Sequence, residues 1–174
     1  MRVATSADAD ALGALHVASW RWAYEGLLPA DYLAGLDPAE RSAWWRTVLS
    51  QPWPGSVLVA ERAGKVIGFV TVGPSTPSQS GDSADPDGRG TAVLYAIYLH
   101  PLSAGTGVGH LLHQAGLAVL RDQGYTDATL WVLRTNRRAI AFYERHGWSP
   151  DGREQLDHSV PGVVLDEIGM RRKL

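Results

Sequence analysis

Three glycines at alternate positions form the most chemically informative spacing in the sequence. Gly105, Gly107 and Gly109 follow an apolar, strand-like run that ends at Leu99, and a helical pattern begins among them. Alternating glycines let the backbone come close to a ligand, and the first N–H groups of a helix have no partner within that helix. Together with the helix dipole they suit an anion such as a pyrophosphate. Tight packing of the helix on the sheet is the alternative interpretation.

Two common phosphate-binding patterns do not fit this segment. A P-loop needs GxxxxGK[ST], and no lysine lies near the glycines. A dinucleotide fingerprint needs GxGxxG, but His110 stands at its sixth position. That fingerprint also needs an acidic residue at the end of the next strand, whereas Asp127 lies at the start of the predicted one. A nucleotide-dependent oxidoreductase is therefore disfavoured.

The composition limits the class of partner. The 174 residues carry a formal charge of −2, which argues against nucleic acid, and they include no cysteine, which excludes disulfides, thiolate zinc sites and a cysteine nucleophile. His110 and His113 are spaced for a metal pair but have no third ligand, so no metal is expected. The longest apolar stretch, residues 92–99, is eight residues long, too short for a membrane span. The N-terminus is polar and acidic, unlike a secretory signal, so we expect a cytoplasmic protein.

Hydrophobic periodicity predicts the elements that must position the glycines. They alternate between strands and helices, with one clear βαβ crossover, so the predicted fold class is α/β with a mixed sheet. One predicted helix starts near Thr5, with Asp8 as a capping-box partner, and the other helical regions cover 29–49, 107–124 and 136–146. The predicted strands are 56–61, 65–72, 93–99, 127–133, 148–152 and 163–171.

The segment over 74–90 differs in composition from its surroundings. Its sequence, PSTPSQSGDSADPDGRG, contains one alanine and no larger apolar residue apart from proline. Such a stretch cannot bury enough surface to offset its ordering entropy. We expect a flexible loop within one domain, residues 1–174, and both a plain insertion and a substrate-gating lid remain open.

Two motifs in the second half of the chain resemble those of the GCN5-related N-acetyltransferase (GNAT) family. Residues 99–109, LHPLSAGTGVG, are similar to the motif V-x-P-x-x-[QR]-x-x-G-x-G, and residues 136–148, NRRAIAFYERHGW, are similar to N-x-x-A-x-x-[FL]-Y-E-x-x-G-[FW]. Residues 16–33 also resemble a subgroup of bacterial members. The resemblance covers nearly the whole chain apart from 74–90. It implies the GNAT fold, a central mixed sheet splayed near the end of the 91–99 strand with the cofactor in the split.

The resemblance also implies acetyl-CoA as co-substrate and assigns residues to it. The backbone of Ile97, Tyr98 and Leu99 is expected to pair with the pantetheine arm and the thioester carbonyl. The pyrophosphate is expected in a cradle formed by Gly105, Thr106, Gly107, Val108, Gly109 and His110. Asn136 is expected on the pantetheine or phosphate end, and Tyr143 near the sulfur, where it can protonate the leaving thiolate.

Phosphate binding is one point at which the sequence departs from the family pattern. The motif's Gln/Arg position is Ala104, and Thr106 stands where Lys or Arg is common. We therefore expect backbone amides to carry most of the phosphate binding, with help from Arg137 or Arg138.

The expected reaction is direct attack by a primary amine of a small molecule or peptide on the acetyl thioester. Many family members use a glutamate as the general base, but the matching positions here are Val93 and Trp131. A non-catalytic acyl-CoA-binding or sensing module is therefore the alternative. The remaining base candidates are His100, Tyr98, Glu25 and His158, or a bound water.

Aromatic residues in the N-terminal region are candidates for the acceptor site. In the family this region forms the acceptor wall, so Trp20, Tyr24 and Trp45 are expected to line an aromatic pocket; simple packing of helices on the sheet is the alternative. A loop over 153–162 is expected to close the other side, with polar contacts from Asp157 and His158. Such a pocket favours a small apolar or aromatic amine. Homodimers are common in the family, and no exposed seam indicates one here.

Overall fold

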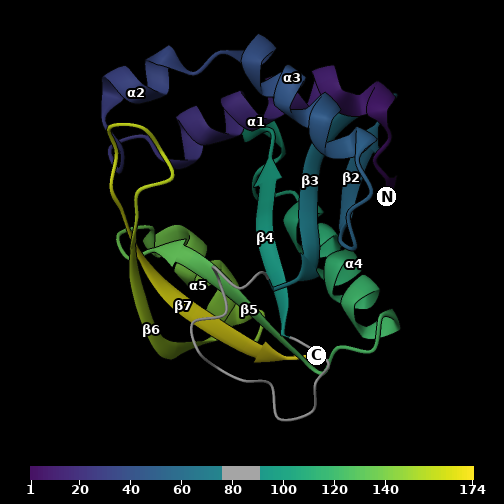
Figure 1. Cartoon of the computed structure of the whole chain (residues 1–174), viewed down its shortest axis with the longest axis vertical. Coiled ribbons are helices and arrows are strands. Elements are labelled where there is room, and N and C mark those ends of the chain that lie inside the picture. The colour runs from purple at the N-terminus through teal and green to yellow at the C-terminus, as the bar shows by residue number, and fades with distance from the viewer. Residues whose placement is uncertain (76–90) are drawn as a thin grey trace.

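A seven-stranded mixed sheet forms the centre of the computed structural model, which describes residues 1–75 and 91–174 (Figure 1). Its spatial order is β1-β2-β3-β4-β5-β7-β6, and the predicted mixed α/β sheet is confirmed. Every neighbouring pair is antiparallel except β4 with β5. From residue 76 onward, the loop predicted over 74–90 lies outside the described residues. The strands are β1 (Arg2–Val3), β2 (Ser56–Arg62), β3 (Lys65–Pro74), β4 (Ala92–Leu99), β5 (Asp127–Leu133), β6 (Ser149–Asp157) and β7 (Leu165–Lys173).

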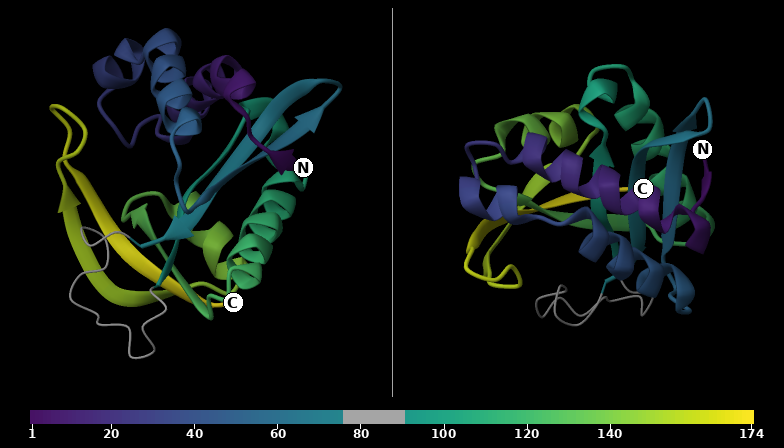
Figure 2. Two further views of the ribbon diagram at one scale, coloured as in Figure 1. Left: turned by 45° about the vertical axis from the view of Figure 1, so that its right-hand side comes forward. Right: turned by 90° about the horizontal axis from the view of Figure 1, so that it is seen from above.

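The sheet splits between its two parallel strands. β4 and β5 pair only at their beginnings, where Ala92 lies opposite Ala128 and Val93 lies opposite Thr129. Beyond these residues β4 stays with β3 while β5 turns away with β7, so the sheet opens into a V (Figure 2). One edge of β4 from Leu94 to Leu99 therefore lacks a neighbouring strand and faces the split.

Helices cover both faces of the strands on the β2–β4 side (Figure 2). The helices are α1 (Ala9–Ala23), α2 (Ala30–Gly35), α3 (Pro38–Ser50), α4 (Val108–Asp122) and α5 (Arg137–Arg145). Side chains alternate along β3, so Val70 packs in the core under α4 while Phe69 packs with Leu12 and Trp45 under α1 and α3. Within the described part of the chain, no helix is long and apolar enough to cross a membrane.

The structure departs from the prediction most clearly in three places. The helical region over 29–49 is two helices, because Leu36 is extended and Asp37 caps α3 by accepting a hydrogen bond from the Ala39 amide at 2.7 Å. The Thr5–Asp8 capping box forms, but around a short 3-10 turn before α1. The loop predicted over 153–162 is wrong in its first half, since β6 runs to Asp157. Both faces of β6 are largely polar, so its sequence lacks the apolar alternation that identifies a strand.

Candidate functional site

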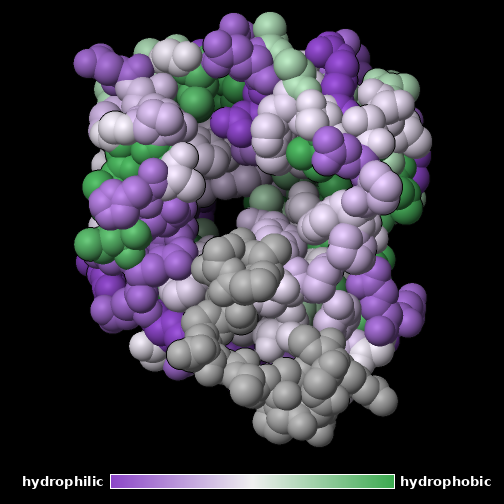
Figure 3. Space-filling model, viewed as in Figure 1, coloured by the Kyte–Doolittle hydropathy of each residue, from purple (hydrophilic) through white to green (hydrophobic). Residues whose placement is uncertain are grey.

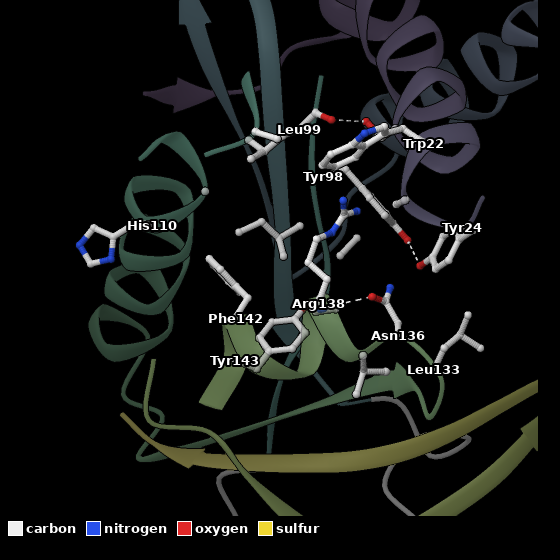
Figure 4. Close-up of a pocket in the computed structure, with 18 of the residues that line it drawn as sticks. Trp22, Tyr24, Tyr98, Leu99, His110, Leu133, Asn136, Arg138, Phe142 and Tyr143 are labelled. Carbon is white, nitrogen blue, oxygen red and sulfur yellow. Dashed lines mark hydrogen bonds between the residues drawn. The ribbon is translucent and has the colours of Figure 1, made fainter. Parts of the chain in front are cut away.

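The split between β4 and β5 leads into a cavity of about 470 Å³ (Figures 3 and 4). This volume lies within the range of small-molecule binding sites. The space-filling view shows the hollow between the N-terminal helices and the sheet (Figure 3). The cavity brings together ten of the residues predicted for the site: Tyr24, Ile97, Tyr98, Leu99, Gly105, Gly107, Gly109, His110, Asn136 and Tyr143.

The glycine segment forms one end of the cavity. Gly105 and Gly107 have φ angles of +73° and +84°, in the left-handed region that favours glycine. Gly107 is the N-cap of α4, and no side chain of the described residues caps this end of the helix. A Cβ at either glycine would meet no other atom within 4 Å. The free amides of the first helical turn therefore face open space, as an anion site requires.

Thr106 and Val108 do not line the cavity. The Thr106 hydroxyl donates a hydrogen bond to the Ser103 carbonyl at 2.8 Å, which fixes the turn before α4. Val108 is the first residue of α4, and its side chain is buried in the core. The contribution of these two residues to the cradle is therefore limited to their backbone atoms.

The exposed edge of β4 forms the floor. Ile97, Tyr98 and Leu99 pair with Val70, Phe69 and Gly68 of β3 on one side, and their other side faces the split. The Leu99 carbonyl accepts a hydrogen bond from the Ser19 hydroxyl of α1 at 2.8 Å (Figure 4). This bond ties α1 to the end of β4 and leaves the edge before Leu99 available to a ligand.

α5 contributes polar side chains from the opposite wall. Asn136 caps the helix by accepting a hydrogen bond from the Ala139 amide at 3.0 Å, so its side-chain NH₂ is the group left for a ligand. Arg138 and Arg145 line the cavity, whereas Arg137 does not. The Arg138 guanidinium lies 3.6 Å from the centre of the Trp22 ring, a cation–π contact between α5 and α1.

Tyr143 lies on the same wall, with only 8% of its surface exposed. It packs against Phe142 and Trp148. Burial raises the pKa of its phenol, and Tyr24 adds a smaller contribution. The hydroxyl therefore stays protonated at neutral pH and can act as a proton donor.

The aromatic residues of the N-terminal region occupy different layers. The Tyr24 hydroxyl shares a hydrogen bond of 2.7 Å with the Tyr98 hydroxyl at the cavity wall (Figure 4). Trp20 contacts the Tyr24 ring from behind, at 5.1 Å between centroids, and does not line the cavity. Trp45 is 2% exposed in the core against Phe69, which matches the packing alternative rather than the pocket.

The predicted candidates for the general base, apart from Tyr98, lie elsewhere. Glu25, His100 and His158 do not line the cavity, and His158 is exposed after the end of β6. Among residues 1–75 and 91–174, no group of three or more histidines and acidic residues could hold a metal ion. His110 instead contacts His146, with 2.9 Å between ring nitrogens.

Sequence reasoning missed two charged residues of the cavity, Arg145 and Glu167. Glu167 of β7 is the only carboxylate among the described residues that line it. Val93 is buried in the core, and Trp131 lines the cavity without offering a base. The sequence places Glu167 in a predicted closing strand. The residues of β6 that lie opposite Glu167 were not predicted to form a strand, so nothing indicated that Glu167 faces the cavity.

Comparison with known proteins agrees with this geometry. The acetyltransferase (GNAT) family model matches residues 16–148. An uncharacterised N-acetyltransferase of Bacillus subtilis is 30% identical over 170 residues, which cover 98% of this chain and 90% of that protein. A mycothiol acetyltransferase of Thermobispora bispora is 31% identical over 131 residues, 72% of this chain but only 42% of that protein.

A solved structure matches nearly the whole chain. The PaiA N-acetyltransferase of Thermoplasma acidophilum, solved in complex with coenzyme A, superposes with a TM-score of 0.76 over 99% of this chain and 97% of that one. The two sequences are 21% identical, so this likeness shows the fold.

Proposed function

Because the chain belongs to the acetyltransferase (GNAT) family and is therefore an acyltransferase, we propose that it transfers the acetyl group of acetyl-CoA to a primary amine of a small molecule or peptide. The transfer is direct, with both substrates bound at once. The activity belongs to one domain, residues 1–174, because the cavity takes residues from α1 at one end of the chain to β7 at the other.

The observation that carries the proposal is the continuity of the cavity from the start of α4 to Tyr143. The free amides at the start of α4 suit a diphosphate, and Arg138 and Arg145 of α5 add positive charge to the cavity. The β4 edge offers backbone groups to an amide-containing arm. The space above Gly105 and Gly107 is open to such a ligand, so these residues fit coenzyme A.

Acetyl-CoA supplies an acyl group activated as a thioester. The chain's part is to hold that group and the amine in reacting geometry, which can supply about 7–11 kcal/mol of the barrier. Backbone N–H groups of β4 stabilise the negative charge that develops on the carbonyl oxygen. The Tyr143 hydroxyl donates a proton to the leaving sulfur. Tyr24 and Tyr98 form the aromatic wall that supports a small apolar or aromatic amine as acceptor.

Calorimetry with acetyl-CoA, followed by a thiol-release assay over a panel of amines, tests the proposal. We expect saturable binding of acetyl-CoA and release of one thiol per amine acetylated. Absence of acetyl-CoA binding to the pure protein overturns the proposal. Binding without thiol release for any amine indicates the acyl-CoA-binding module instead.

A further inference from the structure

The position of Glu167 on its strand points its side chain into the cavity. Glu167 lies directly opposite Leu133 in the β5–β7 pair, and side chains of directly paired residues lie on the same face of a sheet. Leu133 lines the cavity, as does Glu167. The carboxylate is therefore a fixed part of the wall formed by β5 and β7, on the far side of the split from β4.

One oxygen of this carboxylate is held and the other is available. Oε2 accepts a hydrogen bond of 2.7 Å from the side-chain amide of Gln155, the residue directly opposite on β6. In residues 1–75 and 91–174, no group donates a hydrogen bond to Oε1. A carboxylate that lines a cavity, is oriented by one bond and has a second oxygen with no donor among the described residues suits a cationic ligand.

Glu167 is electrostatically linked to the predicted acceptor wall. Burial raises the pKa of the Tyr24 hydroxyl, and the Glu167 carboxylate raises it further. Tyr24 in turn makes a smaller contribution to the raised pKa of Tyr143. Tyr24 thus lies within electrostatic reach of both the carboxylate and the proposed proton donor.

The charges that line the cavity come from different elements. The cations Arg138 and Arg145 come from α5, and the Arg138 guanidinium lies 3.6 Å from the centre of the Trp22 ring of α1. Glu167 provides the negative charge from β7. An acceptor that enters between Tyr24 and Glu167 therefore meets a carboxylate and aromatic rings.

We propose that Glu167 binds the ammonium form of the acceptor and removes one of its protons before acetyl transfer. The acceptor class is a basic primary amine with an uncharged, largely apolar body. This inference rests on the proposed function and names the general base that the sequence did not reveal.

The surroundings of Glu167 favour this role. Burial raises the pKa of the carboxyl above its ordinary value, the hydrogen bond from Gln155 opposes that shift, and Asp157 of β6 adds to it. A carboxylate with a raised pKa is a stronger base, closer to the pKa of the proton that it removes. An ordinary alkylamine has a pKa of about 10.4, so at neutral pH it arrives protonated and needs such a base.

The protons and electron pairs balance in the following way. An ammonium N–H gives its proton to Glu167 Oε1, and the freed lone pair on nitrogen forms the new C–N bond. The C–S bond breaks with its electron pair on sulfur, which receives the Tyr143 proton. A second proton leaves the nitrogen and restores the phenol. Glu167 releases its proton to solvent, so each turnover yields an amide, a thiol and one proton.

The Glu167→Gln variant tests the assignment because it removes the charge and keeps the shape. We expect kcat/KM for a basic alkylamine to fall about 100-fold at pH 7.5, since general-base catalysis contributes about 10²–10⁴-fold. An arylamine, which is neutral at this pH, is expected to lose less than about threefold, since it has no proton to remove before attack. Affinity for acetyl-CoA, measured by calorimetry, is expected to stay within twofold of wild type.

A pH profile and two further variants complete the test. The alkylamine defect is expected to shrink as the pH approaches the amine's own pKa, because the neutral amine then forms in solution. Glu154→Gln makes the same change at an exposed carboxylate on β6, 64% exposed and paired with Arg134, and is expected to behave as wild type. Glu167→Asp keeps a carboxylate and is expected to lose about tenfold, within the range of base catalysis.

The outcomes separate this inference from the proposed function. Wild-type kinetics in Glu167→Gln with the alkylamine overturns the inference while leaving the acetyltransferase intact. Equal losses for both amines, or a loss that is constant with pH, assigns Glu167 a structural role and also overturns it. Failure of the wild-type protein to release thiol with any amine overturns the proposed function, and that failure is seen before any variant is made.

Discussion

The two halves of the cavity are built in different ways. The proposed cofactor half, residues 99–110 and 136–145, offers free backbone amides at the start of α4 and side chains of α5, and it comes from two short continuous segments. The proposed acceptor half, Tyr24, Tyr98 and Glu167, presents side chains that three separate segments bring together. Backbone groups suit a ligand that a whole family shares, because they do not depend on side-chain identity. A site built from side chains can change its specificity when a single side chain is substituted.

This difference explains why one half can be identified from sequence and the other cannot. Backbone recognition needs glycines and a helix start at fixed spacing, so it leaves a continuous motif. Side-chain recognition depends on which strands become neighbours. Glu167 faces the cavity because β7 pairs with β5, and no local pattern contains that information.

Removal of the proposed proton donor is expected to have the largest effect. Tyr143→Phe deletes one hydroxyl from the cofactor half and is expected to lower kcat about 10²–10³-fold, within the range for general acid catalysis. Acetyl-CoA affinity is expected to change little, because the phenyl ring keeps its contacts. Steady-state kinetics with calorimetry in parallel measures both effects.

Tyr125→Phe is the matched control for this change. Tyr125 packs against the same core cluster as Tyr143 but does not line the cavity. It is expected to keep wild-type turnover. A near wild-type rate in Tyr143→Phe removes this residue from the mechanism and leaves the thiolate to be protonated by solvent.

Sequence reasoning succeeded where the physics was local. The crossover from β4 through α4 to β5 follows from apolar periodicity, and the glycines at 105 and 107 do adopt left-handed φ angles at the helix start. It missed the second half of β6, whose polar faces hide the strand beyond residue 152, and it was wrong at Trp45, whose type suits a pocket as well as a core. Whether Trp45 lies in the core or in the cavity depends on how the helices pack on the sheet, and this packing cannot be read from the sequence.

One buried, neutral histidine lies near each half of the cavity, and these two histidines are expected to make the folded protein less stable in acid. The pKa values of His16 and His113 are lowered to about 3, chiefly by burial. Below the ordinary value of about 6.5 the unfolded chain binds protons that the folded chain does not, so stability falls as the pH falls. Each histidine is expected to reduce the unfolding free energy by about 1.4 kcal/mol per pH unit between about pH 6 and pH 4.5.

Two substitutions separate the histidines. His16 lies among aromatic rings, and neither of its ring nitrogens has a hydrogen-bond partner in residues 1–75 and 91–174. His16→Leu is therefore expected to remove half of the acid slope without loss of stability at pH 7. His113 accepts a hydrogen bond from the Trp148 indole at 2.8 Å. His113→Leu is therefore expected to cost about 1–3 kcal/mol at pH 7 as well. Urea unfolding from pH 7 to pH 4.5 measures both, and an unchanged slope in His16→Leu contradicts the prediction.

Backbone recognition in the cofactor half predicts a smaller, specific effect for a glycine. Gly107→Ala forces a side chain into the left-handed region, which costs about 1–2 kcal/mol unless the turn shifts and misplaces its amides. Gly124, with φ of +89° and open space around it, lies just beyond the other end of α4. Both alanine variants are expected to lose similar stability, but only Gly107→Ala is expected to weaken acetyl-CoA binding, by about tenfold. Equal affinities in calorimetry contradict an amide cradle at this turn.

The contact between Trp22 and Arg138 joins the two halves, and its effect is expected to be the smallest. The indole comes from α1 and the guanidinium from α5, and Trp22 is 36% exposed. A cation–π pair at an exposed position contributes about 0.5–1 kcal/mol. A double-mutant cycle with Trp22→Leu and Arg138→Gln is expected to show a coupling of that size in the unfolding free energy. Additive losses mean that the halves are energetically independent, so that the acceptor half can be altered without disturbing the site for the cofactor.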